Sequence, residues 1–354
     1  MKDRILSIQY MRGIAALLVV LFHYRFMLNN RYAQEDLGGI FSYGGLGVDI
    51  FFMISGFIIS FSTKNDYSKR NFIIKRAFRI LPVYWMVLFI ILIFADNVKL
   101  DINFLKSMFL IQWDYSSSAP FFGYSTLITA WTLSFEVTFY ILFMLSMAIS
   151  HKYRSIICSV LIISTVMILQ LYFNRSFNIS GYSSASTDYS ILRLLSSPML
   201  LEFAFGMLVY EFTRLDFKIY KNKHVKYFIN IIFLTSLFYT LACYLSGHGK
   251  GHGLQGYGGY TAFLFFFWVL HEKVNTIKDV KALRNLGDWS YSIYLIHFML
   301  LMLIPFIDHY LTIFLVSYGA SKFIFLTCMT IVISKVTYDY LEKKSMIISK
   351  YFLK

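Results

Sequence analysis

The chain has 354 residues, of which 58% are hydrophobic and 19% aromatic, and its mean hydropathy of +0.60 lies outside the soluble globular range. A formal net charge of +14 would point to nucleic acid in a soluble protein, but in a membrane protein the distribution of charge decides its meaning. We therefore expect an all-α, polytopic transmembrane helical bundle that forms one membrane domain over residues 1–354.

Apolar stretches predict about ten spans. They lie near residues 8–28, 44–61, 78–95, 129–150, 155–173, 192–212, 227–246, 257–271, 289–307 and 311–334. If the N-terminus is cytoplasmic, 24 lysines and arginines fall in inner segments and five in outer ones. This asymmetry predicts both termini in the cytoplasm, and it explains the basic excess without a nucleic-acid partner. The expected location is the inner or plasma membrane, crossed several times and in contact with lipids.

The first span carries two polar residues, Arg12 near its start and His23 near its far end. Eleven residues make about three helical turns, so the two side chains share one face about 16 Å apart. Ionisable residues at both ends of one face indicate a path across the bilayer. The alternative is an arginine that snorkels and a histidine that is hydrogen-bonded in the core.

The second span, GVDIFFMISGFIIS, places Asp49 in its outer part, where a carboxylate needs a partner. Gly47, Ser55 and Gly56 are small enough to allow close helix contact. We expect Asp49 and Ser55 to line a chamber, unless this is a packing helix with one capping acid.

The next loop ends in KRAFRILPVYW, in which Arg76 and Arg79 are three residues apart on one helix face. Two guanidinium groups at that spacing suit a phosphate or pyrophosphate. Contact with lipid headgroups would explain the same pattern.

The fourth span begins AWTLSFEVTFY and brings Trp131, Ser134 and Glu136 to the outer half of the membrane. Because His23 lies at a similar depth, Glu136 is expected to orient it, as in a general base. A purely structural buried pair is the alternative.

Two later spans add polar residues. Glu202 lies near mid-membrane, and Ser290, Tyr294 and His297 form one stripe on the ninth span. We expect Glu202, Tyr294 and His297 to belong to the chamber.

The outer loop SGHGKGHGLQGYGG contains His248 and His252 without a nearby acid or cysteine, so a flexible loop is expected. The three cysteines show no metal-ligand spacing, and no metal is expected.

Together these motifs resemble the integral-membrane acyltransferase-three family. The matching features are the Arg12–His23 spacing, GVDIFFMISGF, RAFRILPVYW, WTLSFE and SYSIYLIH, and they extend from residue 12 to residue 297. The resemblance implies transfer of an acyl group, usually acetyl, from cytoplasmic acetyl-CoA to a hydroxyl of a surface or exported polysaccharide.

Carried onto this chain, the resemblance makes His23 the central catalytic residue and gives Arg12 a part in donor binding. Arg76 and Arg79 would hold the CoA phosphates. Many members carry a fused esterase-like domain, which we do not expect in a chain that ends at Lys354, so a separate extracellular or periplasmic transferase could complete the reaction.

Our mechanistic hypothesis makes His23 a general base oriented by Glu136, with an acyl-histidine intermediate left open. Aromatic residues between Gln112 and Ser125 would stack on the acceptor, a surface polysaccharide or lipid-linked glycan. Two alternatives remain: a transporter or flippase for a glycan or lipid-linked intermediate, and the same enzyme with succinyl or another acyl group. The oligomeric state is left open.

Overall fold

The computed structural model describes residues 5–29, 36–95, 97–215, 220, 222–310 and 319–353. Within these ranges the chain forms helices and no strand, apart from an isolated antiparallel bridge between Ser180 and Gly253. The predicted all-α class is confirmed for the described residues.

Fourteen α-helices occur in the described part of the chain. They are α1 (Leu6–Tyr24), α2 (Leu46–Ser62), α3 (Lys69–Phe94), α4 (Ile102–Met108), α5 (Trp131–Ile149), α6 (Arg154–Asn174), α7 (Ser190–Leu195), α8 (Met199–Arg214), α9 (Lys223–Ser246), α10 (Tyr257–Val274), α11 (Lys281–Met302), α12 (Ile304–Tyr310), α13 (Ala320–Thr337) and α14 (Lys343–Ser349). A π-helical segment, Tyr338–Glu342, joins the last two.

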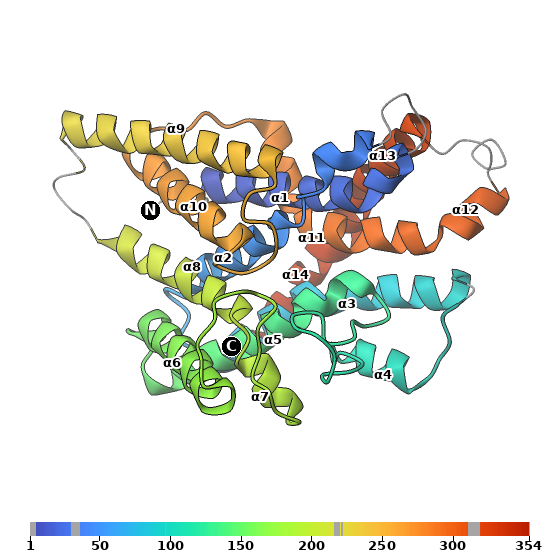
Figure 1. Ribbon diagram of the computed structural model, residues 1–354, viewed down its shortest axis with the longest axis horizontal. Helices are drawn as coiled ribbons and strands as arrows, with labels where there is room; N and C mark the ends of the chain where they lie inside the picture. Colours follow the sequence, from blue (N-terminus) through green and yellow to red (C-terminus); the bar gives the residue numbers. More distant parts are fainter. Residues whose placement is uncertain are drawn as a thin grey trace.

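The centre of the bundle is built on α1 and α2 (Figure 1). Helix α1 packs along α11 and against α2, and α2 packs along α8 and α10. Helices α9 and α10 lie side by side at one edge, whereas α3, α5 and α6 lie toward the opposite edge (Figure 1). Helix α1 thus contacts helices on several sides, and half of its apolar span is buried inside the protein.

Helices α2 and α8 approach closely because each presents a glycine to the other. A Cβ on Gly206 would lie 1.9 Å from the Met53 carbonyl oxygen, and one on Gly56 would lie 2.1 Å from that of Phe203. The predicted close contact at Gly56 is confirmed, and it brings α2 against the helix that carries Glu202.

Seven described helical segments are long and apolar enough to cross a membrane, or eight if the pair α11–α12, bent by 66°, is one span. This fits a multi-pass membrane protein, although the predicted total of about ten is higher. The stretch 192–212 is interrupted at Pro198, so its second part, α8, has only 16 residues and carries three charged side chains. The stretch 257–271 forms α10, which is not among the seven.

The last predicted span, 311–334, begins in residues 311–318, which lie outside the described residues. From Ala320 onward it is helical, and the helical path continues through α13, the π-helical segment and α14 to Phe352. The C-terminal residues therefore pack back on the bundle, with α14 against α3.

Candidate functional site

A cavity of about 80 Å³, open at its mouth, lies between α1, α2, α3, α5 and α11. Its polar lining consists of Arg12, Ser55, Arg76, Arg79, Thr132, Glu136, Tyr140, Ser290, Tyr291 and Tyr294. Its apolar lining is mostly the isoleucines and phenylalanines of α2. The fold therefore brings together all three arginines to which the family resemblance gives a part in binding the acyl-CoA donor. We call this space the arginine cavity.

The arginines reach the cavity from two helices. Helix α1 supplies Arg12, and α3 supplies Arg76 and Arg79 one turn apart. Among the described residues, no carboxylate lies within 4 Å of any of the three guanidinium groups. Like charges repel one another, the more distant carboxylates Glu136 and Glu342 offset part of that repulsion, and an anionic ligand would relieve more of it.

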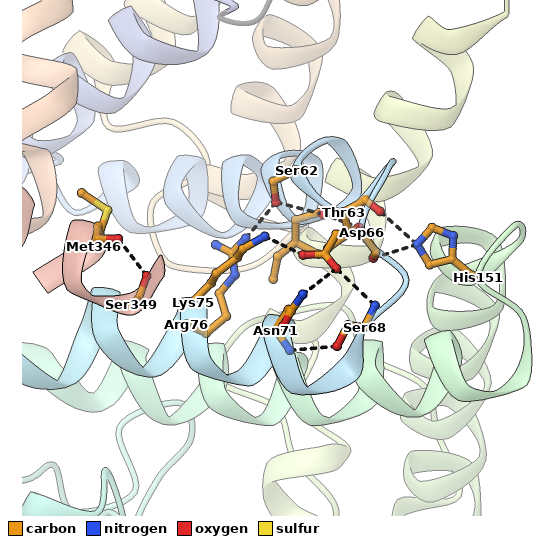
Figure 2. Close-up of polar contacts among 11 residues, drawn as sticks. Ser62, Thr63, Asp66, Ser68, Asn71, Lys75, Arg76, His151, Met346 and Ser349 are labelled. Carbon is orange, nitrogen blue, oxygen red and sulfur yellow. Dashed lines mark hydrogen bonds and ion pairs between the residues drawn. The ribbon is translucent and has the colours of Figure 1, made fainter. Parts of the chain in front are cut away.

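Arg76, near the start of α3, is held by the last residue of α2 (Figure 2). Its Nη2 donates to Ser62 Oγ at 2.8 Å, while its buried Nε has no hydrogen-bond partner among the described residues. Beside it, Lys75 Nζ donates to Asp66 at 2.5 Å, and Asp66 also accepts from the Ser68 N–H at 3.2 Å. The end of α2 thus fixes one end of the guanidinium, and no described residue uses Nε.

Asp66 stays ionised in this network. Partial burial alone would raise the pKa of its carboxyl, but the hydrogen bonds from Lys75, the Ser68 N–H and Asn71 together lower that pKa below its usual value. His151, in the short segment between α5 and α6, contacts the same loop. Its Nε2 lies 2.9 Å from the Thr63 carbonyl oxygen (Figure 2).

Glu136 is the acidic group of the cavity, and its position differs from the prediction. Its Oε1 accepts from Ser55 Oγ at 3.3 Å and from Tyr140 OH through a short hydrogen bond. These partners hold the carboxylate toward α2 and its own helix. Glu136 therefore does not orient His23 in the structure.

The residue beside His23 is His297, and the carbonyl contacts assign the proton positions of both rings. His297 Nδ1 lies 3.1 Å from the Ile293 carbonyl oxygen, so Nδ1 carries the proton and Nε2 is an acceptor in the neutral ring. His23 Nδ1 lies 2.9 Å from the Val19 carbonyl oxygen and 3.3 Å from His297 Nε2. The Val19 contact requires a proton on His23 Nδ1, and the His297 contact is compatible with that proton, which leaves the lone pair on His23 Nε2. That nitrogen is able to accept a proton.

Tyr294 links the histidine pair to the cavity. It lines the cavity, its ring lies 5.8 Å from that of His297, and its OH bonds Thr132 Oγ1 at 3.0 Å and the Thr129 carbonyl oxygen at 2.8 Å. The stripe predicted on the ninth span is thus divided: Ser290 and Tyr294 line the cavity, whereas His297 lies behind it.

Several predicted chamber residues do not line the cavity. Ser134 Oγ donates to the Leu110 carbonyl oxygen at 2.6 Å, which is a structural contact between α5 and the segment after α4. Trp131 packs behind Phe52, with ring centroids 6.2 Å apart. His23, Asp49, Glu202 and His297 are also absent from the lining. Sequence position gives the depth of these residues but not the direction in which they point.

Asp49 finds its expected partner in a loop that we predicted to be flexible. His252 Nδ1 lies 2.7 Å from Asp49 Oδ2, and the Gly253 N–H donates to Oδ1 at 2.8 Å. Asp49 is completely buried, and so is Glu202, which interacts electrostatically with it. The glycine-rich loop is therefore anchored on α2, and the prediction that no acid accompanies these histidines is wrong for His252.

The sequence interpretation also missed residues near the arginines. Tyr140 lies one turn after Glu136, a spacing that could have revealed it. Glu342 is buried in the π-helical segment, accepts from Ser292 Oγ at 2.7 Å and interacts electrostatically with Arg79 and Arg12. It occurs in a basic tail that gives no local signal for a buried carboxylate.

The chain is similar to known proteins over most of its length. The acyltransferase-three family model, described as an acyltransferase domain, matches residues 5–339. The exopolysaccharide production protein ExoZ of Rhizobium meliloti (strain 1021) is 30% identical over 280 residues, covering 75% of this chain and 79% of ExoZ. No solved structure matches.

Two further relatives are longer than this chain. A candidate O-acetyltransferase of Staphylococcus aureus (strain COL) is 23% identical over 94% of this chain and 56% of its own length. YrhL of Bacillus subtilis (strain 168), a candidate peptidoglycan O-acetyltransferase, is 23% identical over 83% of this chain and 48% of its own length. The chain thus spans about half of each of these two relatives.

Proposed function

The chain belongs to the acyltransferase-three family, and from that premise we propose that it transfers an acetyl group from acetyl-CoA to a hydroxyl of a cell-surface or exported polysaccharide. The observation that carries the proposal is the arginine cavity. Coenzyme A bears a pyrophosphate and a 3′-phosphate, and guanidinium groups bind phosphates through paired hydrogen bonds. Arg12, Arg76 and Arg79 offer such donors at a single place.

The donor would enter at the end of α3 where these arginines lie, which the positive-inside rule assigns to the cytoplasm. Helix α1 runs from Arg12 to His23, a distance of about 16 Å along its axis. A pantetheine arm is of comparable length, so phosphates bound at Arg12 would allow the thioester to reach the histidine pair.

His23 would act on the acceptor hydroxyl. Its Nε2 takes the hydroxyl proton while the oxygen bonds to the thioester carbonyl carbon. The carbon–sulfur bond then breaks, and the CoA thiolate recovers the proton from the imidazolium. By accepting from His23 Nδ1, His297 keeps the lone pair of His23 on its Nε2. An acyl-histidine route would use the same nitrogen as nucleophile.

The acceptor class is proposed from the relatives, whose names refer to exopolysaccharide production and to peptidoglycan. Acetyl is proposed because two of them are named as candidate O-acetyltransferases. A separate transferase partner on the outer side would be compatible with this scheme if the acetyl group passes through a carrier.

The test is transfer of labelled acetyl from acetyl-CoA to surface polysaccharide by the purified protein in liposomes. We expect label on the polysaccharide, and a rate that falls sharply in His23→Ala. A folded His23→Ala protein that transfers at the normal rate would contradict the catalytic assignment. Movement of polysaccharide across the membrane without label would instead identify a transporter, and transfer from succinyl-CoA at a higher rate would change the acyl group.

A further inference from the structure

We propose that His252 and the aromatic rings around it form a binding subsite for the acceptor sugar, with His252 Nε2 accepting a hydrogen bond from one sugar hydroxyl. This inference rests on the proposed function for the identity of the sugar. It adds to that function an acceptor site separate from the arginine cavity. The residues concerned are His252, Asp49, Phe121, Trp131, Tyr182 and Tyr257, which we call the His252 cluster.

The polar part of the cluster is a fixed imidazole. Both oxygens of Asp49 are occupied, one by His252 Nδ1 at 2.7 Å and the other by the Gly253 N–H at 2.8 Å. The carboxylate is completely buried and therefore holds the Nδ1 proton in place. In the neutral ring the lone pair is then on Nε2, which has no hydrogen-bond partner among the described residues and is not among their fully buried unpaired atoms.

The apolar part is a set of aromatic rings around this imidazole. Ring centroids of Trp131 and Tyr257 lie 5.6 Å from that of His252, and those of Phe121 and Tyr182 lie at 6.2 and 6.3 Å. Tyr182 is 52% exposed, whereas Trp131 and Tyr257 are buried. Aromatic rings with a few well-placed polar groups are typical of ligand sites, and sugars present both C–H faces and hydroxyls.

A structural role for the loop alone does not explain this arrangement. Anchoring the loop on α2 needs the Nδ1 proton and the Gly253 N–H, and both are used. It does not need a second ring nitrogen, beside an exposed tyrosine, to which no described residue bonds. The unused acceptor is the feature that points to a ligand.

The cluster adjoins the arginine cavity. Trp131 contacts Phe52, which lines the cavity, and it directly precedes Thr132, which lines it too. On the other side, residues 44 and 45 connect the cluster to helix α1: a Cβ on Gly44 would lie 2.9 Å from Phe22 Cβ, and Phe22 precedes His23. The cluster thus meets the wall of the arginine cavity at the residue pair Trp131–Phe52.

Two substitutions separate binding from folding. Asn at position 252 can place an amide N–H where Nδ1 was, so His252→Asn keeps a donor to Asp49 and removes the rest of the ring, Nε2 included. Gly45→Ala leaves the cluster unchanged but adds a methyl 3.7 Å from His252 Cε1 and 4.0 Å from Nε2. Those are ordinary contact distances, and the backbone at residue 45 is helical (φ −55°), so alanine fits without strain.

The experiment measures binding by saturation-transfer NMR, with purified protein and oligosaccharides released from the surface polysaccharide of cells that lack this gene. We expect the wild type to bind, with saturation reaching the sugar protons that lie on aromatic rings. Loss of one hydrogen bond should raise the Kd about tenfold in His252→Asn, and the methyl of Gly45→Ala should raise it at least as much. The melting temperature of each variant is the control for folding.

Each outcome is decisive. The inference is supported if both variants keep the wild-type melting temperature and bind about tenfold more weakly. It is overturned if Gly45→Ala or a stable His252→Asn binds with the wild-type Kd, or if the wild type itself does not bind. If His252→Asn is unstable, Gly45→Ala decides alone.

The same samples distinguish this inference from the proposed function. A wild type that binds the oligosaccharides but transfers no acetyl group would refute the function and leave the subsite standing. A wild type that transfers acetyl, with variants that bind normally, would refute the subsite and leave the function standing.

Discussion

The arginine cavity and the His252 cluster differ in whether their charged groups have direct partners. In the cavity, three guanidinium groups face one another without a carboxylate within 4 Å among the described residues. In the cluster, both oxygens of Asp49 are occupied and one imidazole nitrogen is left over. An anion would stabilise the guanidinium groups of the cavity. In the cluster, by contrast, the paired Asp49 carboxylate fixes the direction in which His252 Nε2 can accept a hydrogen bond. We therefore propose different ligands for the two regions, a phosphorylated donor and a sugar.

Removal of His23, one of the histidine pair, should have the largest effect. His23→Ala removes the nitrogen that takes the hydroxyl proton, so kcat should fall about 100-fold or more. The fall in kcat is measured from the steady-state rate of transfer of labelled acetyl. The control is His248→Ala, an exposed residue of the outer loop. Comparable rates for the two variants would move the chemistry away from His23.

Loss of His297 should have the next largest effect, because His297 acts through His23. His297→Phe keeps a buried ring but removes the acceptor for His23 Nδ1 at 3.3 Å. We expect kcat to fall about tenfold with both KM values unchanged, since the proton on His23 is then fixed by the Val19 carbonyl alone. A purely structural role would instead lower the melting temperature and leave kcat per folded molecule intact.

Substitution of the cavity arginines should affect the donor alone. Arg76→Ala or Arg79→Ala should raise the KM for acetyl-CoA about tenfold and leave the acceptor KM unchanged. The matched control is Arg214→Ala, an arginine paired with Glu211 at 2.8 Å outside the cavity. Initial rates at varied acetyl-CoA measure the effect. An unchanged donor KM in both variants would remove the phosphate-binding role.

Substitution in the His252 cluster should give the converse result. Tyr182→Ala removes an exposed ring, so the acceptor KM should rise a few fold while the donor KM stays the same. Tyr182→Phe should restore binding, since it restores the ring. Tyr172→Ala, which removes a tyrosine 66% exposed on α6, is the control. An effect of Tyr182→Ala on the donor KM would erase the distinction between the two regions.

The smallest effect is expected at Asp66, which supports the start of α3. The pKa of Asp66 is lowered in the folded protein, so its contribution to stability is complete above its usual value of about 4 and is lost only as the pH falls through the lower, folded value. Between about pH 5 and 8 the charge of Asp66 should therefore not change with pH. Asp66→Asn weakens the bond to Lys75 and should raise the donor KM about twofold, measured as for Arg76.

Much of the fold and part of the site could be predicted from local sequence. Apolar length predicts helices, and the three-residue spacing of Arg76 and Arg79 predicts their common face. Which helices pack together was not predictable, because it depends on contacts far apart in sequence. The partner of His23 is 274 residues away and that of Asp49 is 203 away. Depth in the membrane suggested Glu136 for His23, but the orientation of α5 directs that carboxylate toward Ser55.

The central claim is that an acyl group passes from a donor at the arginine cavity to an acceptor on the other side of the membrane. The most direct measurement uses sealed vesicles of known orientation, with labelled acetyl-CoA only on the side of the α2–α3 loop and polysaccharide only on the opposite side. We predict that label accumulates on the polysaccharide with the wild type and not with His23→Ala. Label that appears only when donor and acceptor share one side, or that appears equally with His23→Ala, would contradict this account.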